Sequence, residues 1–327
     1  MTARAEQLRT SLIAVNSGLV LMLLLLLGCN SQKEDDIGAD TTVSDKPKLS
    51  EEARRKYENV INASRKAIAH NPNDAVAYYN MGLAHKLLGE YTKAVSAYKT
   101  SIQLDPSAMD TYHNLATVYL DLGRCADAAD AYKKAVSMKP DTPLPYHGLG
   151  VAYGRLGRHE ESITAHKQAI AVDPDFAEAY YGMGMACDKL GRHTEAIANY
   201  KKTLDINPTH ANAYSNMSLS YRGLGQYDAA VVACKKAIAI KPDLSAAYNN
   251  MGLAYDGLEQ YADAIGAYKK AVMLDPDDAA AYYNMGITYQ AMGKEKMAVD
   301  SYKKVIAIGS RGKAADLARQ RLKELQD

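Results

Sequence analysis

The sequence predicts an all-α superhelical solenoid built from seven consecutive helical hairpins, and three observations predict it. Proline recurs every 34 residues, at Pro72, Pro106, Pro140, Pro174, Pro208, Pro242 and Pro276. Tyrosine keeps the same period, at Tyr78, Tyr112, Tyr146, Tyr180, Tyr214, Tyr248 and Tyr282. No insertion or deletion disturbs the register between them. A constant period of this length indicates small units that are stable only when they stack on their neighbours.

Each unit is expected to form two helices that pack against each other. In the sixth unit, a first helix over residues 245–258 places Tyr248 and Tyr255 on one face, and a second, over about 263–274, places Tyr268 on its inner face. A small residue in each first helix should leave room for the aromatic ring opposite. These residues are Gly82, Gly150, Gly184, Gly252 and Gly286, with Ala116 and Ser218 as substitutes.

The repeated pattern has an aromatic residue, then Met251-Gly252, Tyr255, Ala264, Tyr268 and a closing Pro276 in the sixth unit. It resembles the tetratricopeptide repeat (TPR). The resemblance implies a right-handed superhelix with seven repeats over residues 75–312. The repeats are 75–108, 109–142, 143–176, 177–210, 211–244, 245–278 and 279–312. The resemblance specifies a fold, and folds of this kind host many functions.

The first 28 residues have the features of a secretory signal, with Arg4 and Arg9 ahead of an apolar run. Leu-Leu-Gly before Cys29 resembles the bacterial lipobox, which implies cleavage after Gly28 and lipidation of Cys29. An uncleaved anchor helix is the alternative, although the stretch from Ser11 to Gly28 has only 18 residues. That is short for about 30 Å of hydrocarbon. Residue 30 follows the cysteine and is asparagine. In the enterobacterial sorting rule, aspartate at this position would hold the protein in the inner membrane. Asn30 therefore favours the outer membrane, facing the periplasm.

The regions on either side of the repeats have other roles. Residues 29–49 are polar and are expected to form a disordered tether behind the lipidated cysteine. Residues 50–74 predict an N-terminal capping helix that starts at Ser50 and copies the end of a repeat. Residues 313–327 predict a C-terminal capping helix. Such caps cover the faces that terminal repeats would otherwise expose.

Composition excludes several classes of function. Signal, tether, caps and repeats leave no segment for a catalytic domain, so we do not expect an enzyme, and no phosphate-binding loop or other cofactor motif is present. Without residues 1–28 the chain carries 37 basic and 37 acidic residues. This balance, with no basic stripe recognised in the sequence, argues against nucleic acid as a partner.

Cysteine and histidine positions point to structural roles. Cys187 and Cys234 stand where other units carry core tyrosines, and a free buried thiol is expected for them and for Cys125. His85 and His166 also replace core tyrosines. The pairs His113 with His147 and His159 with His193 should be neighbours, but a zinc site needs three or four ligands. No metal is therefore expected.

The inner wall, formed by the first helices, is the predicted binding surface. Five of the seven units carry asparagine two residues after the opening tyrosine. Aromatic and aliphatic residues flank this row. We expect an exposed amide ladder that grips the backbone of an extended peptide, as in asparagine-laddered TPR and armadillo proteins, which this array resembles. Asparagines that only help repeats to stack are the alternative. The predicted groove residues are Tyr79, Asn80, Leu83, Asn114, Tyr181, Asn216, Asn249, Asn250, Leu253, Tyr283, Asn284 and Ile287.

These features together predict a lipid-anchored protein–protein interaction scaffold or assembly factor of the bacterial cell envelope. Its partners would be segments of envelope proteins, and the lipid would attach it to the membrane. The chain resembles repeat lipoproteins that assist pilus, secretin or outer-membrane assembly. A regulatory subunit of an envelope enzyme, an intracellular adaptor anchored at the inner membrane, and direct binding of peptidoglycan by the tyrosines are the alternatives.

Overall fold

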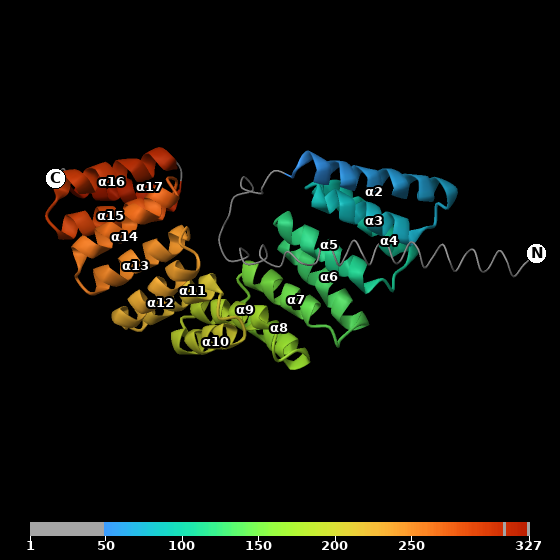
Figure 1. Ribbon diagram of the computed structural model, residues 1–327, viewed down its shortest axis with the longest axis horizontal. Helices are drawn as coiled ribbons and strands as arrows, with labels where there is room; N and C mark the ends of the chain where they lie inside the picture. The colour runs from blue at the N-terminus through green and yellow to red at the C-terminus, as the bar shows by residue number, and fades with distance from the viewer. Residues whose placement is uncertain (1–48, 310–311, 326–327) are drawn as a thin grey trace, which may run out of the picture. The chain divides into compact units, whose positions relative to one another are not determined.

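A computed structural model describes residues 49–309 and 312–325, and within these ranges the protein consists of sixteen helices without a β-strand. The all-α fold class is therefore confirmed. The hairpins follow one another in chain order through the repeat region, from α3 to α16 (Figure 1). Cys29 and the segment around it lie outside the described residues.

Each repeat contributes a first helix of 13 residues and a second helix of 14. The first helices are α3 (Ala75–Leu87), α5 (Met109–Asp121), α7 (Pro143–Arg155), α9 (Ala177–Lys189), α11 (Ala211–Gly223), α13 (Ser245–Gly257) and α15 (Ala279–Ala291). The second helices are α4 (Tyr91–Leu104), α6 (Cys125–Met138), α8 (His159–Val172), α10 (His193–Ile206), α12 (Tyr227–Ile240), α14 (Tyr261–Leu274) and α16 (Glu295–Ile308).

A residue with positive φ forms the turn inside each hairpin. In six repeats it is glycine, at Gly89, Gly123, Gly157, Gly191, Gly225 and Gly293. In the sixth repeat it is Glu259, at φ 59°, the one non-glycine residue with positive φ in the described chain. After this turn α14 begins at Tyr261, two residues before the expected start, because the tight turn leaves only Gln260 between it and the helix. The expected start of this helix was therefore two residues too far along the chain.

The core of each hairpin is a ring from the second helix set against a small residue of the first. Tyr98, Tyr200, Tyr268 and Tyr302 are fully buried. A Cβ added to Gly252 would lie 2.5 Å from a ring carbon of Tyr268, which is closer than real contacts allow. The expected role of the small residues is thus confirmed. His85 and His166, as well as Cys187 and Cys234, are buried at the core positions predicted for them.

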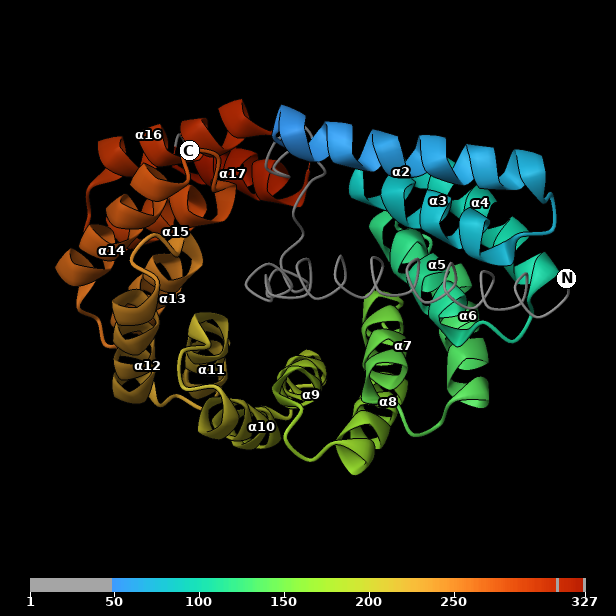
Figure 2. The same cartoon turned by 45° about the vertical axis from the view of Figure 1, so that its right-hand side comes forward.

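Successive hairpins pack through both their helices, but not equally. Each first helix contacts the first helix of the next repeat, whereas no second helix in the described chain contacts the second helix of the next. The first helices therefore lie closer together and form an inner layer, as Figure 2 shows for α9 and α11 beside α10 and α12. Any surface shared by all seven repeats on this side is made from first helices.

A helix covers each end of the array. At the N-terminal end α2 (Glu51–His70) packs on α3, and the Ser50 side chain caps it by accepting a hydrogen bond from the Ala53 amide at 3.2 Å. At the other end α17 (Lys313–Glu324) packs on α15 and α16, and its Ala315 and Ala318 are buried. Within residues 49–309 and 312–325, no helix combines the length and apolar character needed to cross a membrane.

Candidate functional site

The predicted groove residues all lie on first helices, but they differ in exposure. Most are half-buried, whereas Ile287 on α15 is 39% exposed. Tyr181 on α9 and Asn250 on α13 are buried, each 8% exposed. The expectation of an exposed amide ladder is therefore wrong for Asn250, whose side chain is covered by the repeat before it.

Four of the ladder asparagines donate hydrogen bonds from their amide nitrogens to the preceding repeat. Asn114 donates to the Tyr79 hydroxyl (3.2 Å) and Asn216 to the Tyr181 hydroxyl (2.9 Å). Asn250 donates to the Ser215 hydroxyl (3.1 Å) and Asn284 to the Asn249 amide oxygen (3.1 Å). In every case donor and acceptor are 35 residues apart. The asparagines therefore link neighbouring first helices, which is the stacking role that the sequence left open beside peptide binding.

The third and fourth repeats carry glycine at the asparagine position, and the structure gives the reason. A Cβ at Gly148 would lie 2.3 Å from the Tyr132 ring, and one at Gly182 would lie 2.4 Å from the His166 ring. The ring of the preceding second helix therefore occupies the space that an asparagine side chain would need. Ring packing replaces the amide hydrogen bond at these two junctions.

A layer of rings lies directly beneath the inner face. Tyr79 packs against Tyr98, and Tyr283 against Tyr302, with ring centroids 6.0 and 5.7 Å apart. Burial raises the pKa of Tyr79, and the nearby Asp110 carboxylate raises it further. The Tyr79 hydroxyl therefore stays protonated, and its oxygen is an acceptor for Asn114 of the next repeat.

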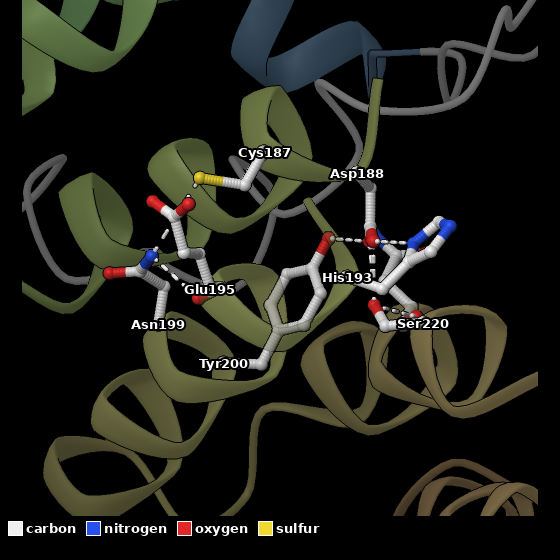
Figure 3. Close-up of polar contacts among 8 residues, drawn as sticks. Cys187, Asp188, His193, Glu195, Asn199, Tyr200 and Ser220 are labelled. Carbon is white, nitrogen blue, oxygen red and sulfur yellow. Dashed lines mark hydrogen bonds and ion pairs between the residues drawn. The ribbon is translucent and has the colours of Figure 1, made fainter. Parts of the chain in front are cut away.

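A carboxylate near the end of α9 collects the most side-chain hydrogen bonds in this region. Asp188 accepts from the Tyr200 hydroxyl at 2.9 Å and from the Ser220 hydroxyl at 2.7 Å, and His193 Nδ1 lies 3.0 Å from it (Figure 3). Because Ser220 gives its proton to the carboxylate and not to an imidazole, the group lacks the nucleophile–base arrangement of hydrolases. Its effect is to join the fourth repeat to the fifth.

Asp256 repeats this arrangement two units later. It accepts hydrogen bonds from the Tyr268 hydroxyl at 2.6 Å and from the Thr288 hydroxyl at 2.9 Å. Burial raises the pKa of Asp256, although the two hydrogen bonds oppose the change. This carboxylate joins the sixth repeat to the seventh.

A pocket on the inner face includes Asp256 of the second cluster among its walls. It has a volume of about 350 Å³. Its walls are Arg222, Tyr227, Leu253, Asp256, Gly257, Asn284 and Ile287. Three of these, Leu253, Asn284 and Ile287, were predicted groove residues, so the structure brings them together. A larger hollow of about 500 Å³ lies among α2, α3 and α4 and contains none of the predicted residues.

The other pocket residues, Arg222, Tyr227, Asp256 and Gly257, were not among the predicted groove residues. Eight positions after the opening tyrosine, the fourth, fifth and sixth repeats carry Asp188, Arg222 and Asp256. At this position only these three successive repeats alternate in charge. That alternation is a signal in the sequence that was available. Tyr227 could not be found in this way, because its position depends on a glycine of the next repeat: a Cβ at Gly257 would lie 2.3 Å from the Tyr227 ring.

The cysteines and histidines of the described residues do not form a set of metal ligands. Cys125 is half-buried, and burial raises the pKa of both Cys187 and Cys234 to about 11. In the described ranges no three His, Cys, Asp or Glu side chains are placed to hold a metal ion together. The absence of a metal remains a prediction for the whole chain.

Comparison with protein families gives three matches along the chain. The model described as the Cilia and flagella-associated protein 70 C-terminal domain matches residues 43–244. Models described as TPR repeat and as tetratricopeptide repeat match residues 257–293 and 279–308. No curated protein matches the chain.

Solved structures with the same fold include a tetratricopeptide repeat protein from Parabacteroides merdae. It is 19% identical, with a TM-score of 0.62, and the match covers 84% of this chain and 100% of that one. The yeast Tom70 structure is 13% identical, with a TM-score of 0.59, and the match covers 86% and 61% of the two chains. A MamA protein is 32% identical over 52% of this chain and 92% of that one, with a TM-score of 0.48. The chain belongs to the tetratricopeptide repeat family, and over residues 43–244 to the family described as the Cilia and flagella-associated protein 70 C-terminal domain.

Proposed function

We propose that the protein is a lipid-anchored scaffold or assembly factor of the bacterial cell envelope that binds extended segments of other proteins along its inner face. The observation that carries the proposal is the pocket between α11 and α15, where Leu253 and Ile287 present apolar surface beside the Asn284 amide. Apolar walls with a few fixed polar groups are typical of binding sites. The tetratricopeptide fold supports a role in protein–protein interaction.

The asparagines contribute to this function indirectly. Their Nδ2 atoms hold adjacent first helices together, so the apolar side chains between them keep a fixed spacing. A ligand then meets a surface that is already ordered, which lowers the entropic cost of binding. Contact with the ligand comes mainly from the half-buried and exposed aliphatic residues in the row.

Affinity capture from cross-linked membranes tests the scaffold function. Ile287→Ala should reduce recovery of captured partners about tenfold, on the scale of a moderate interface contact. Met273→Ala is the matched control, because Met273 is 62% exposed on α14 and lies outside the inner row. Equal recovery with both variants would show that partners bind another face.

The anchor belongs to the same proposal and rests on the lipobox-like residues before Cys29. Cys29→Ser should abolish incorporation of a labelled acyl chain and release the protein from the detergent phase. Cys125→Ser is the control. Protease treatment of spheroplasts should digest a periplasmic array and spare an intracellular one. Acylation that survives Cys29→Ser would rule out this anchor.

A further inference from the structure

Among the described residues that line the pocket on the inner face, Arg222 is the only cationic one. It lies in the last turn of α11 and is exposed. Among residues 49–309 and 312–325 it takes part in no ion pair. Its planar group of N–H donors is therefore available to a ligand.

The neighbouring carboxylates form no ion pair with Arg222. Asp256 lines the same pocket, but its oxygens are engaged by the hydroxyls of Tyr268 and Thr288. Asp188, one repeat earlier, is engaged by Tyr200 and Ser220 in the same way. Both acids are held by hydroxyl groups of their own clusters, so the guanidinium keeps its donors for an incoming acceptor.

The rest of the pocket is suited to an apolar group. Leu253 and Ile287 form an aliphatic wall, and the ring of Tyr227 lies against Gly257, where any larger residue would displace it. A single pocket thus combines an open cation with an apolar surface. A ligand that satisfies both needs an anionic group and an aliphatic group a few ångströms apart.

We infer that Arg222 determines specificity, by selecting a partner segment that carries an aspartate or glutamate side chain next to an aliphatic residue. This inference rests on the proposed binding of extended segments. The predicted row continues on both sides of the pocket, through Asn216 on α11 and Tyr283 on α15. A bound chain therefore passes through, and the carboxylate comes from a side chain and not from a C-terminus.

Selection of random twelve-residue peptides on the full-length protein tests the inference. Selected peptides should be enriched in acidic residues beside Leu, Ile or Val. Arg222→Gln should weaken a selected peptide roughly five- to thirtyfold, the effect of a charge-assisted hydrogen bond at a partly exposed site. Lys189→Gln, which removes an exposed charge at the end of α9 outside the pocket, should leave binding unchanged.

A charge exchange completes the test. Arg222→Glu should lose the acidic peptides and bind versions in which lysine replaces the acidic residue. Amidation of the peptide C-terminus should have no effect, and loss of binding on amidation would overturn the inference in favour of a terminal carboxylate. Peptides that depend on Ile287 but tolerate Arg222→Gln would overturn the role of Arg222 and leave the proposed function standing. Failure to select any peptide that depends on Ile287 would overturn both.

Discussion

The third repeat and the last three repeats hold their first helices together in different ways. Around the third repeat, Gly148 and Gly182 replace asparagine, and rings fill the junctions. His147 and His166 lie with ring centroids 5.2 Å apart, and the Nδ1 atom of each is buried with no hydrogen-bond partner in the described chain. In the last three repeats, an asparagine amide joins each pair of neighbours, and the Asp256 carboxylate adds a hydrogen bond from Thr288 between the last two.

This contrast shows that one backbone fold can be stabilised by two kinds of junction. The junctions of the third repeat depend mainly on ring packing and on imidazoles that stay neutral, with one hydrogen bond from Arg155 to the Leu120 carbonyl and an exposed ion pair between Arg192 and Glu160. The C-terminal junctions depend on directional hydrogen bonds such as those of Asn250 and Asp256. The two regions should therefore respond differently to truncation, to acid and to loss of single hydrogen bonds.

Truncation of the core rings should lower the free energy of unfolding more than any other change. The loss should be greater in the C-terminal region. Tyr268→Ala should cost about 3–5 kcal/mol, as large aromatic truncations do, because it also leaves Asp256 with one hydrogen bond fewer. His166→Ala removes a smaller ring without a hydrogen bond at Nδ1 and should cost about 1–3 kcal/mol. Urea unfolding followed by circular dichroism would measure both, and the Tyr268 variant should lose two-state behaviour as repeats uncouple. A cost under about 1 kcal/mol for Tyr268→Ala would contradict the role assigned to this ring.

Acid should destabilise the third repeat. Burial lowers the pKa of His147 from 6.5 to about 4 and lowers the pKa of His166 as well. His113 adds repulsion, and its own pKa is lowered by burial and by Lys86 against the opposing effect of Asp110. The unfolded chain therefore binds protons first, and stability is full above pH 6.5 and falls between pH 6.5 and 4. The loss should be on the order of 2–3 kcal/mol for His147, and protonation of His166 should act in the same direction.

The variant His147→Tyr/His166→Tyr provides the control for this pH dependence. Other repeats carry tyrosine at both positions, and the tip of Tyr132 already packs on Gly148 as His166 packs on Gly182. Its unfolding free energy should vary less between pH 7 and 4.5 than that of the wild type. The raised pKa of Asp256 acts in the opposite direction, since protonation of this buried carboxyl stabilises the fold. Equal pH dependence in the two proteins would contradict the assignment.

Loss of a ladder amide should have a moderate effect that depends on burial. Asn250→Ala removes hydrogen bonds to the Ser215 carbonyl and hydroxyl at a buried site and should cost about 1–2 kcal/mol. Asn284→Ala removes one hydrogen bond at a half-buried site and should cost less than about 1 kcal/mol. Chemical denaturation compares the two variants. The reverse order would mean that these contacts do not carry the stability of the junctions.

Replacement of the unusual turn residue should give the smallest effect. Glu259→Gly places glycine where φ is 59°, so the hairpin should gain about 0.5–1 kcal/mol. The opposite change, Gly225→Ala, should lose a similar amount, since its φ is 72°. Thermal melting would show a higher Tm for the first variant and a lower one for the second. A lower Tm after Glu259→Gly would point to a stabilising contact of the glutamate side chain.

The period of the sequence was sufficient to predict the helices and their cores. Proline and tyrosine spacing placed each hairpin, and the small residues opposite the rings behave as expected at Gly252 and its equivalents. The start of α14 was misplaced because backbone φ at Glu259 is not visible in a pattern of side chains. Fold prediction succeeded where neighbouring copies impose the same local geometry.

The candidate site was less predictable because it depends on contacts between repeats. Leu253, Asn284 and Ile287 were found from their shared position, and they line one pocket. The burial of Asn250 was missed, since it depends on Ser215 in the repeat before it. Tyr227 was missed for the same reason, whereas the charge alternation at Arg222 could have been recognised in the sequence. A residue's accessibility in such an array is set by the identity of a partner about one period away.

The hydrogen bonds that asparagine side chains make between first helices also bear on how the array would respond to a pulling force. Each bond joins residues 35 apart, so it resists the sliding of one hairpin past the next. Gly148 and Gly182 leave the third repeat without such an asparagine bond on either side, and its contact with the second repeat includes a hydrogen bond from Arg155 Nη1 to the Leu120 carbonyl instead. If the array were pulled from its two ends, residues 143–176 should therefore extend before the repeats that asparagine bonds join. The flanking repeats would stay folded, and the third repeat would act as a compliant joint between two stiffer segments.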